Sequence, residues 1–117
     1  MALLDRLLAT FLGWRIDREA ERVRVELEAA VAVCVAHAKR SWISMAALPF
    51  KDDAPLADVI EAIGIPFQTY VETRYPVLLS RPGMLQTMLW AGIVEAGTHP
   101  KQEIDEAFAT LIGRYTQ

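Results

Sequence analysis

The chain has 117 residues, a length that suits one domain with its own core and leaves little room for a second. Its formal net charge of −3 disfavours nucleic acid as the main partner, because the molecule as a whole does not attract phosphate. A single cysteine excludes an internal disulfide, so nothing indicates an oxidising compartment and we expect a cytoplasmic protein.

The sequence is rich in apolar residues. Hydrophobic residues make up 53% of the chain. A chain of this size leaves roughly a third of its unfolded surface exposed, so spare apolar side chains tend to form a patch that another protein covers. The longest apolar run, Ala29 to Ala36, falls well short of the roughly 20 residues that span a membrane, and the start lacks the pattern of a secretion signal. We therefore expect no transmembrane segment.

Residues 1–14 predict a short amphipathic helix that ends near Gly13. Its apolar residues recur at helical spacing over an arc of about 180°, with Asp5 and Arg6 on the opposite side. Membrane-surface contact is disfavoured, because interfacial helices are usually rich in lysine and arginine. Two interpretations stay open: the helix packs on the core of its own domain, or it binds a partner. The predicted partner-binding residues are Leu4, Leu7, Leu8, Phe11, Leu12 and Trp14.

Residues 17–47 predict the longest helix, with Asp17 as its N-cap and pairs such as Arg24 and Glu28 at i,i+4 spacing. Part of this segment, 22–35, also alternates as a strand does. We favour a helix because such a strand would far exceed the usual five or six residues and because the segment is rich in alanine. It should be the central helix of the fold.

The remaining helical part, 55–115, follows a loop at 49–55 that two prolines define. A short helix should stop at Gly64, and a second should begin at Pro66 and end or kink at Pro76. A further helix should end at Gly97, and Thr98 to Pro100 should open the last one. These elements predict an all-α fold: a single domain, 1–117, folded as a compact bundle of five or six helices around the 17–47 helix.

Gly92 falls inside the helix that precedes Gly97. A glycine in the interior of a helix lowers its stability, so its presence needs a reason in the packing. We expect the backbone of another element to approach closely at Gly92.

The sequence offers little chemistry. Two histidines, one cysteine and three serines form no recognisable nucleophile motif, and the glycines are too scattered for a phosphate-binding loop. Cys34 and His37 share one helix face, but two ligands do not make a metal site, and a packed thiol is the favoured interpretation. We expect neither metal nor cofactor, and the sequence disfavours an enzyme without excluding one.

Residues 56–75 resemble a helix-turn-helix unit, with Gly64 as the turn. Three departures weaken the resemblance: Ile60 stands where a small residue is usual, Phe67 where a polar one is, and the second helix has one arginine to offset Glu72. An ordinary corner between two helices is the favoured interpretation. If DNA were bound, phosphate contacts would come from Arg15, Arg18, Arg22, Lys39 and Arg40. The residues that would reach bases are Gln68, Thr69, Thr73 and Arg74.

The prediction that follows is a non-enzymatic interaction or assembly subunit, an adaptor or scaffold that docks through apolar helix faces. Its partner would be a second copy, most simply in a homodimer, or another protein. The alternative is a small DNA-binding transcriptional regulator that uses the 56–75 unit.

Overall fold

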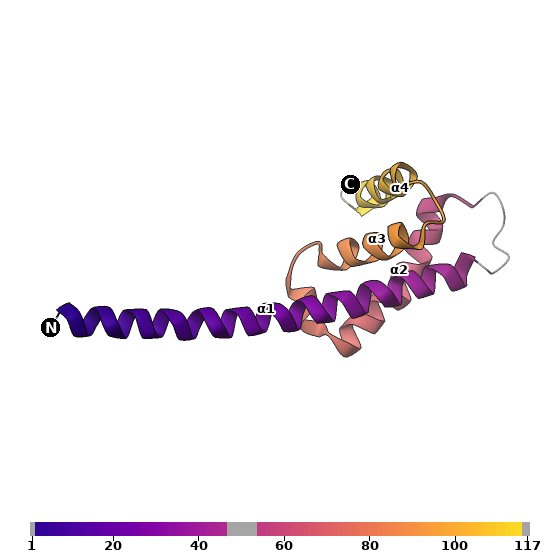
Figure 1. The fold of residues 1–117 in the computed structure, drawn as a ribbon. Helices are drawn as coiled ribbons and strands as arrows, with labels where there is room; N and C mark the ends of the chain where they lie inside the picture. The colour runs from indigo at the N-terminus through magenta and orange to yellow at the C-terminus, as the bar shows by residue number, and fades with distance from the viewer. Residues whose placement is uncertain (1, 47–53, 116–117) are drawn as a thin grey trace. The chain divides into compact units, whose positions relative to one another are not determined.

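The computed structural model describes residues 2–46 and 54–115, and describes side chains within 22–45 and 54–115. It contains the α-helices α1 (Ala2–Ala46), α2 (Leu56–Arg74), α3 (Met84–Ala96) and α4 (Lys101–Tyr115), with a 3₁₀-helix η1 (Pro76–Ser80) after α2 (Figure 1). No strand occurs in these described ranges, so the all-α prediction is confirmed. The four α-helices within 2–46 and 54–115 are fewer than the five or six that were predicted.

Helix α1 runs through the predicted boundary between the 1–14 and 17–47 helices, so that boundary is wrong. A glycine within a helix costs only about 1 kcal/mol relative to alanine, and Gly13 is followed by a long stretch of good helix formers. The strand alternative at 22–35 is also settled in favour of a helix. There the predicted pair of Arg24 and Glu28 is present, with Nε and Oε1 3.8 Å apart.

Helix α2 continues through both Gly64 and Pro66, so the predicted break between two helices is wrong. Proline inside a helix loses one backbone hydrogen bond and costs about 3 kcal/mol or more. Here Ile63 and Phe67, buried on either side of the proline, keep the helix on the core, and burying each such side chain contributes about 1.5–3 kcal/mol. Local helix-breaking signals are therefore outweighed by tertiary packing.

The chain divides into two compact units, Met1–Ala30 (unit 1) and Val31–Gln117 (unit 2). Unit 1 consists of the first part of α1, and in its described portion Val23 and Val25 are exposed. Unit 2 holds the rest of α1 and all the other helices. Helix α1 is the only element described in unit 1, so a helix face there has no second element of that unit to pack against.

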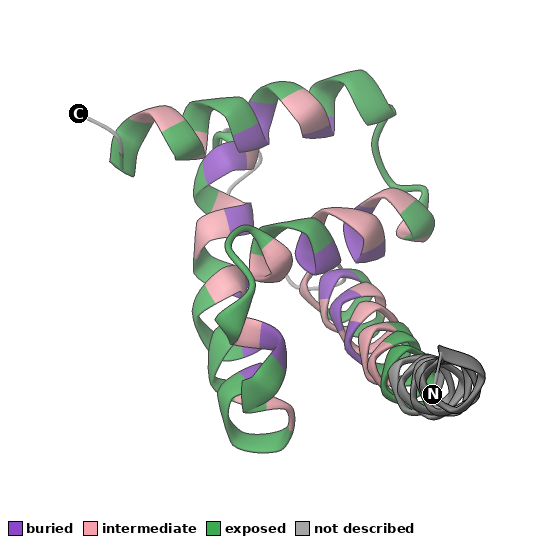
Figure 2. Cartoon of the chain, turned by 90° about the vertical axis from the view of Figure 1, so that its left-hand side faces the viewer, coloured by how far each residue is buried: buried purple, intermediate pink, exposed green. Residues whose placement is uncertain are grey.

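The core of unit 2 is built from the inward faces of its helices (Figure 2). A methyl group on Gly92 of α3 would lie 2.6 Å from Cβ of Ala38 and 2.8 Å from the carbonyl oxygen of Val35. The close backbone approach predicted at Gly92 is thus confirmed, and it brings α3 directly onto α1. The core side chains include Cys34, Ala38, Trp42, Ile60, Ile63, Phe67, Val71, Leu78, Met88, Leu89, Ile93, Ile104, Ala107 and Phe108.

Turns and polar bonds hold the helices of unit 2 in place. Gly97 ends α3 in the left-handed conformation with φ of 69°, as predicted. The indole N–H of Trp42 donates to the hydroxyl of Thr98 at 2.7 Å, and that of Trp90 donates to the carboxylate of Asp105 at 2.6 Å.

Across the part of the chain that the structure describes, no helix is both long enough and apolar enough to cross a membrane.

Candidate functional site

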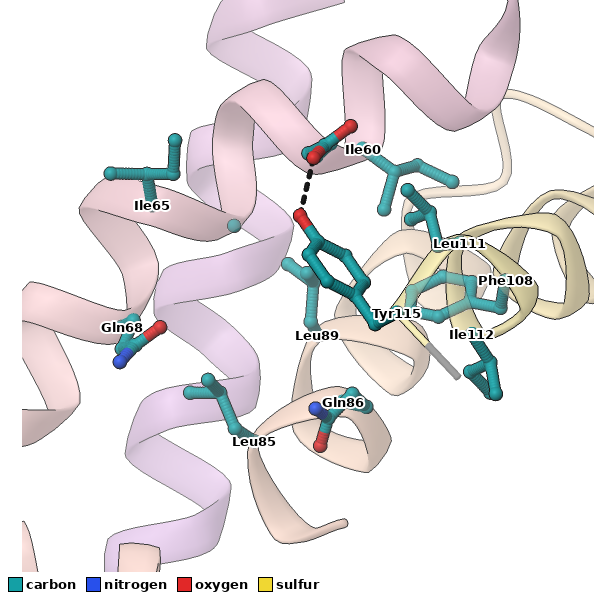
Figure 3. A pocket seen from close by; sticks show the side chains of 12 residues that line it. Ile60, Ile65, Gln68, Leu85, Gln86, Leu89, Phe108, Leu111, Ile112 and Tyr115 are labelled. Carbon is teal, nitrogen blue, oxygen red and sulfur yellow. Dashed lines mark hydrogen bonds between the residues drawn. The ribbon is translucent and has the colours of Figure 1, made fainter. Parts of the chain in front are cut away.

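An apolar groove of about 470 Å³ lies between α2, α3 and α4 in unit 2 (Figure 3). All three helices contribute side chains to it, and most of these are aliphatic or aromatic. Cavities of this size accept small ligands or the side chains of a docked helix. The lining residues are Ile60, Glu61, Gly64, Ile65, Gln68, Leu85, Gln86, Leu89, Phe108, Leu111, Ile112 and Tyr115.

Helical spacing explains how α2 forms one wall. Glu61, Ile65 and Gln68 are spaced by four and three residues, so they share a side of α2 next to its buried face. Gly64 lies on the same side and has no side chain. A Cβ at Gly64 would lie 3.6 Å from Leu89 of α3, an ordinary contact distance. The absence of a side chain at Gly64 therefore makes the groove deeper there by the size of one methyl group.

The rim of the groove carries large apolar side chains that face solvent. Ile65 on α2 is 68% exposed, and on α4 Ile112 is 55% and Tyr115 73% exposed. Single exposed apolar residues are ordinary on protein surfaces, but a group of them around an apolar groove marks a binding surface. Ile65, Ile112 and Tyr115 together form the groove rim.

A polar cluster joins α4 to α2 at the groove. The hydroxyl of Tyr115 donates a hydrogen bond to Glu61, and Arg114 donates from Nη1 to Oε2 of Glu61 at 3.1 Å. The same guanidinium lies 2.8 Å from Oδ1 of Asp58. Hydrogen bonding to Asp58 raises the pKa of Arg114, and hydrogen bonding to Glu61 raises the pKa of Tyr115. Both donors therefore keep their protons at neutral pH.

This cluster decides the charge of the groove. Among the described residues that line it, Glu61 alone carries a charge, and two donors from α4 already bind that charge. The amide groups of Gln68 and Gln86 are neutral, although that of Gln68 donates to Glu72 at 2.8 Å. The arrangement is suited to hold an uncharged apolar group, with hydrogen-bonding groups at its edge.

The four residues predicted to reach DNA bases all lie exposed on α2. Two of them donate their hydroxyl protons to their own helix: Thr69 to the carbonyl of Ile65 and Thr73 to that of Thr69. Gln68 lines the groove, whereas Arg74 lies over the ring of Tyr70. Because α2 has no turn at Gly64, both the corner between two helices that the sequence favours at 56–75 and the helix-turn-helix alternative are wrong. A continuous helix lacks the second, separately angled helix that such a unit would insert into DNA.

The six residues predicted to bind a partner, from Leu4 to Trp14, have their backbone in α1. Their side chains lie outside the described residues. That binding face therefore stays a prediction.

The pair Cys34 and His37 occupies two different environments. Cys34 is fully buried, and burial raises the pKa of its thiol. The ring of His37 stacks in parallel on that of Tyr70, with centroids 3.7 Å apart. Among the described residues no group of three metal-ligating side chains comes together.

Sequence reasoning missed the groove. Its α4 wall is held by a hydrogen bond from Arg114 to Glu61, which are 53 residues apart. No local sequence pattern predicts a contact between residues so far apart. The spacing of Glu61, Ile65 and Gln68 was visible, but a predicted break at Gly64 divided it between two helices.

No protein-family model matches the chain, and neither a curated protein nor a solved structure matches it.

Proposed function

We propose that the protein is a self-assembling subunit, in which the groove of one copy binds the start of α1, residues 4–12, of a second copy. The observation that carries this proposal is the apolar groove with its exposed rim. Amphipathic helices commonly bind in such grooves through apolar anchors spaced i, i+3, i+4 and i+7.

The chain itself contains a helix with that spacing. Leu4, Leu8 and Phe11 stand at i, i+4 and i+7, and Leu7 and Leu12 widen the same apolar arc. The backbone there is helical, and it belongs to unit 1, in which no other element is described. An apolar helix face needs a cover, because isolated helices are marginally stable in water.

The charges of the two surfaces also match. The carboxylate of Glu61 is held by Arg114 and Tyr115, so an apolar occupant would not leave an unpaired charge buried at the contact. On the side of the helix, the charged residues Asp5 and Arg6 fall outside the apolar arc. Both surfaces can therefore be desolvated with little electrostatic cost.

In a reciprocal exchange, two helix-in-groove contacts strengthen one association. Burying a large apolar side chain contributes about 1.5–3 kcal/mol, whereas association costs on the order of 4–15 kcal/mol in lost freedom of motion. A two-fold dimer forms two helix-in-groove contacts and loses that freedom only once. We therefore expect a homodimer in which each copy donates its helix and accepts the other.

Light scattering after size exclusion tests the dimer. The full chain should have the mass of two copies, and deletion of residues 1–12 should give one copy. Ile65→Glu and Ile112→Glu, which place a charge on the groove rim, should also give one copy. Val77→Glu is the matched control, because Val77 is 60% exposed on η1 and does not line the groove.

A mixing experiment separates a specific exchange from general stickiness. The deleted chain keeps a groove, and the Ile65→Glu chain keeps a helix. Each alone should be monomeric, and their mixture should form a one-to-one complex through a single contact, weaker than the parent dimer. A full chain that is monomeric at concentrations near 100 µM, or a mixture that fails to associate while both variants stay folded, contradicts the proposal.

A further inference from the structure

Two basic side chains, His37 and Arg74, contact the ring of Tyr70, and a third, Arg40, acts on His37; none of these residues lines the groove. The rings of His37 and Tyr70 are parallel and 3.7 Å apart, and the guanidinium carbon of Arg74 lies 5.1 Å from the centroid of the Tyr70 ring. Arg40 follows His37 by three residues, which places it on the same side of α1. Groups from α1 and α2 thus meet at one place in unit 2.

The two arginines lack acidic partners there. Within the described part of the chain, neither Arg40 nor Arg74 forms an ion pair, and both are exposed. This contrasts with Arg114, which binds both Asp58 and Glu61. The stack against Tyr70 also restricts Arg74, so less side-chain entropy is lost when that guanidinium binds a ligand.

The positive charges of Arg40 and Arg74 both affect the pKa of His37. Burial lowers the pKa of His37, and the charges of Arg40 and Arg74 lower it further. Among the described residues, the ring of Tyr70 from α2 stacks on the imidazole, and the charges that act on it are those of Arg40 from α1 and Arg74 from α2. An anion bound between the arginines would offset their charges and make protonation of His37 easier.

We propose that His37, Arg40 and Arg74 form a binding site for the phosphoryl group of a small soluble compound. Guanidinium groups bind phosphate through paired N–H donors, and a protonated imidazole adds another donor. Nucleic acids and anionic membranes require a longer basic surface, which two arginines on a chain of net charge −3 do not supply. The site is independent of the assembly proposal, because none of its residues lines the groove.

Titration of the full chain with inorganic phosphate, followed through the imidazole NMR signals, tests the site. Phosphate should shift the His37 signal and raise the pKa of His37, and it should bind more tightly as the pH falls through that pKa. The signal of His99, the chain's other histidine, is the internal reference. Arg40→Gln and Arg74→Gln should each weaken phosphate binding by about tenfold or more, the usual effect of losing a charged hydrogen bond.

Arg81→Gln is the matched control, since it removes the same charge from an exposed arginine that does not act on His37. The proposal is overturned if phosphate leaves the His37 signal where it was, or if Arg81→Gln weakens binding as much as the other two variants. Two further probes identify the source of the phosphoryl group. Tighter, Arg40-dependent binding to duplex DNA or to phosphatidylglycerol vesicles than to phosphate would overturn the assignment to a small compound.

Discussion

The hydroxyl of Tyr115 donates a hydrogen bond to the carboxylate of Glu61, and this bond ties the last residue described in α4 to the groove wall on α2. Tyr115 is largely exposed, so packing alone does not hold it in this position. Its place at the groove depends on a polar contact that can be removed without disturbing the core.

The hydrogen bond to Glu61 raises the pKa of Tyr115, so Glu61→Gln should bring that pKa back toward the ordinary tyrosine value. Because the folded-state pKa is the higher one, the bond's contribution to stability is present below the unfolded pKa and is lost as the pH rises through the folded pKa. Ultraviolet titration of tyrosinate measures this change, with Tyr115→Phe to isolate the signal of Tyr115. Equal titration curves for the parent chain and Glu61→Gln would contradict the prediction.

Gly92→Ala should destabilise unit 2 by about 1–3 kcal/mol, the usual cost of overpacking, because the added methyl group would meet the backbone of α1 at 2.8 Å. Gly113→Ala is the matched control. It lies in α4, where an added Cβ meets nothing within 4 Å, so alanine should stabilise the helix by about 0.5–1 kcal/mol. Urea unfolding of both variants measures the difference. Equal effects of the two substitutions would show that α3 and α1 are not in close contact.

Thr98→Val should cost about 1–3 kcal/mol, because the indole N–H of Trp42 would lose its acceptor. Trp42 is only 2% exposed, so water cannot readily replace the threonine hydroxyl. Thr110→Val serves as the control, since that exposed hydroxyl donates to its own helix at Glu106. Thermal unfolding of the two variants should show a clear loss for the first and little change for the second.

Asp105 should make the protein less stable in acid. Hydrogen bonds from Lys101 and Trp90 lower the pKa of Asp105, and the charge of Lys101 adds to the effect. A lowered folded-state pKa means that the contribution is present above the unfolded pKa and is lost as the pH falls through the folded pKa. As the pH is lowered from 6 to 2, the free energy of unfolding should therefore fall less steeply for Asp105→Asn than for the parent chain. Parallel curves for the two proteins would argue against the network.

Several features of the fold follow from local sequence alone. Pro76 ends α2, Gly97 ends α3 in the left-handed conformation, and Pro100 precedes α4. Each is a matter of backbone geometry within a few residues, which the sequence specifies directly. The close approach at Gly92 was also predicted, although a glycine inside a helix does not by itself require one, since an added Cβ at Gly113 meets nothing within 4 Å.

Contacts between distant residues decided the rest. Gly64 and Pro66 carry the local signals of a helix end, yet the buried side chains around them keep α2 continuous. The groove exists because Arg114 and Tyr115 meet residues of α2 more than 50 positions earlier, and His37 meets Tyr70 only because α1 lies against α2. Sequence determined where most helices begin and end, since that depends on neighbouring residues. Tertiary structure decided which side chains meet, since that depends on the packing of whole helices.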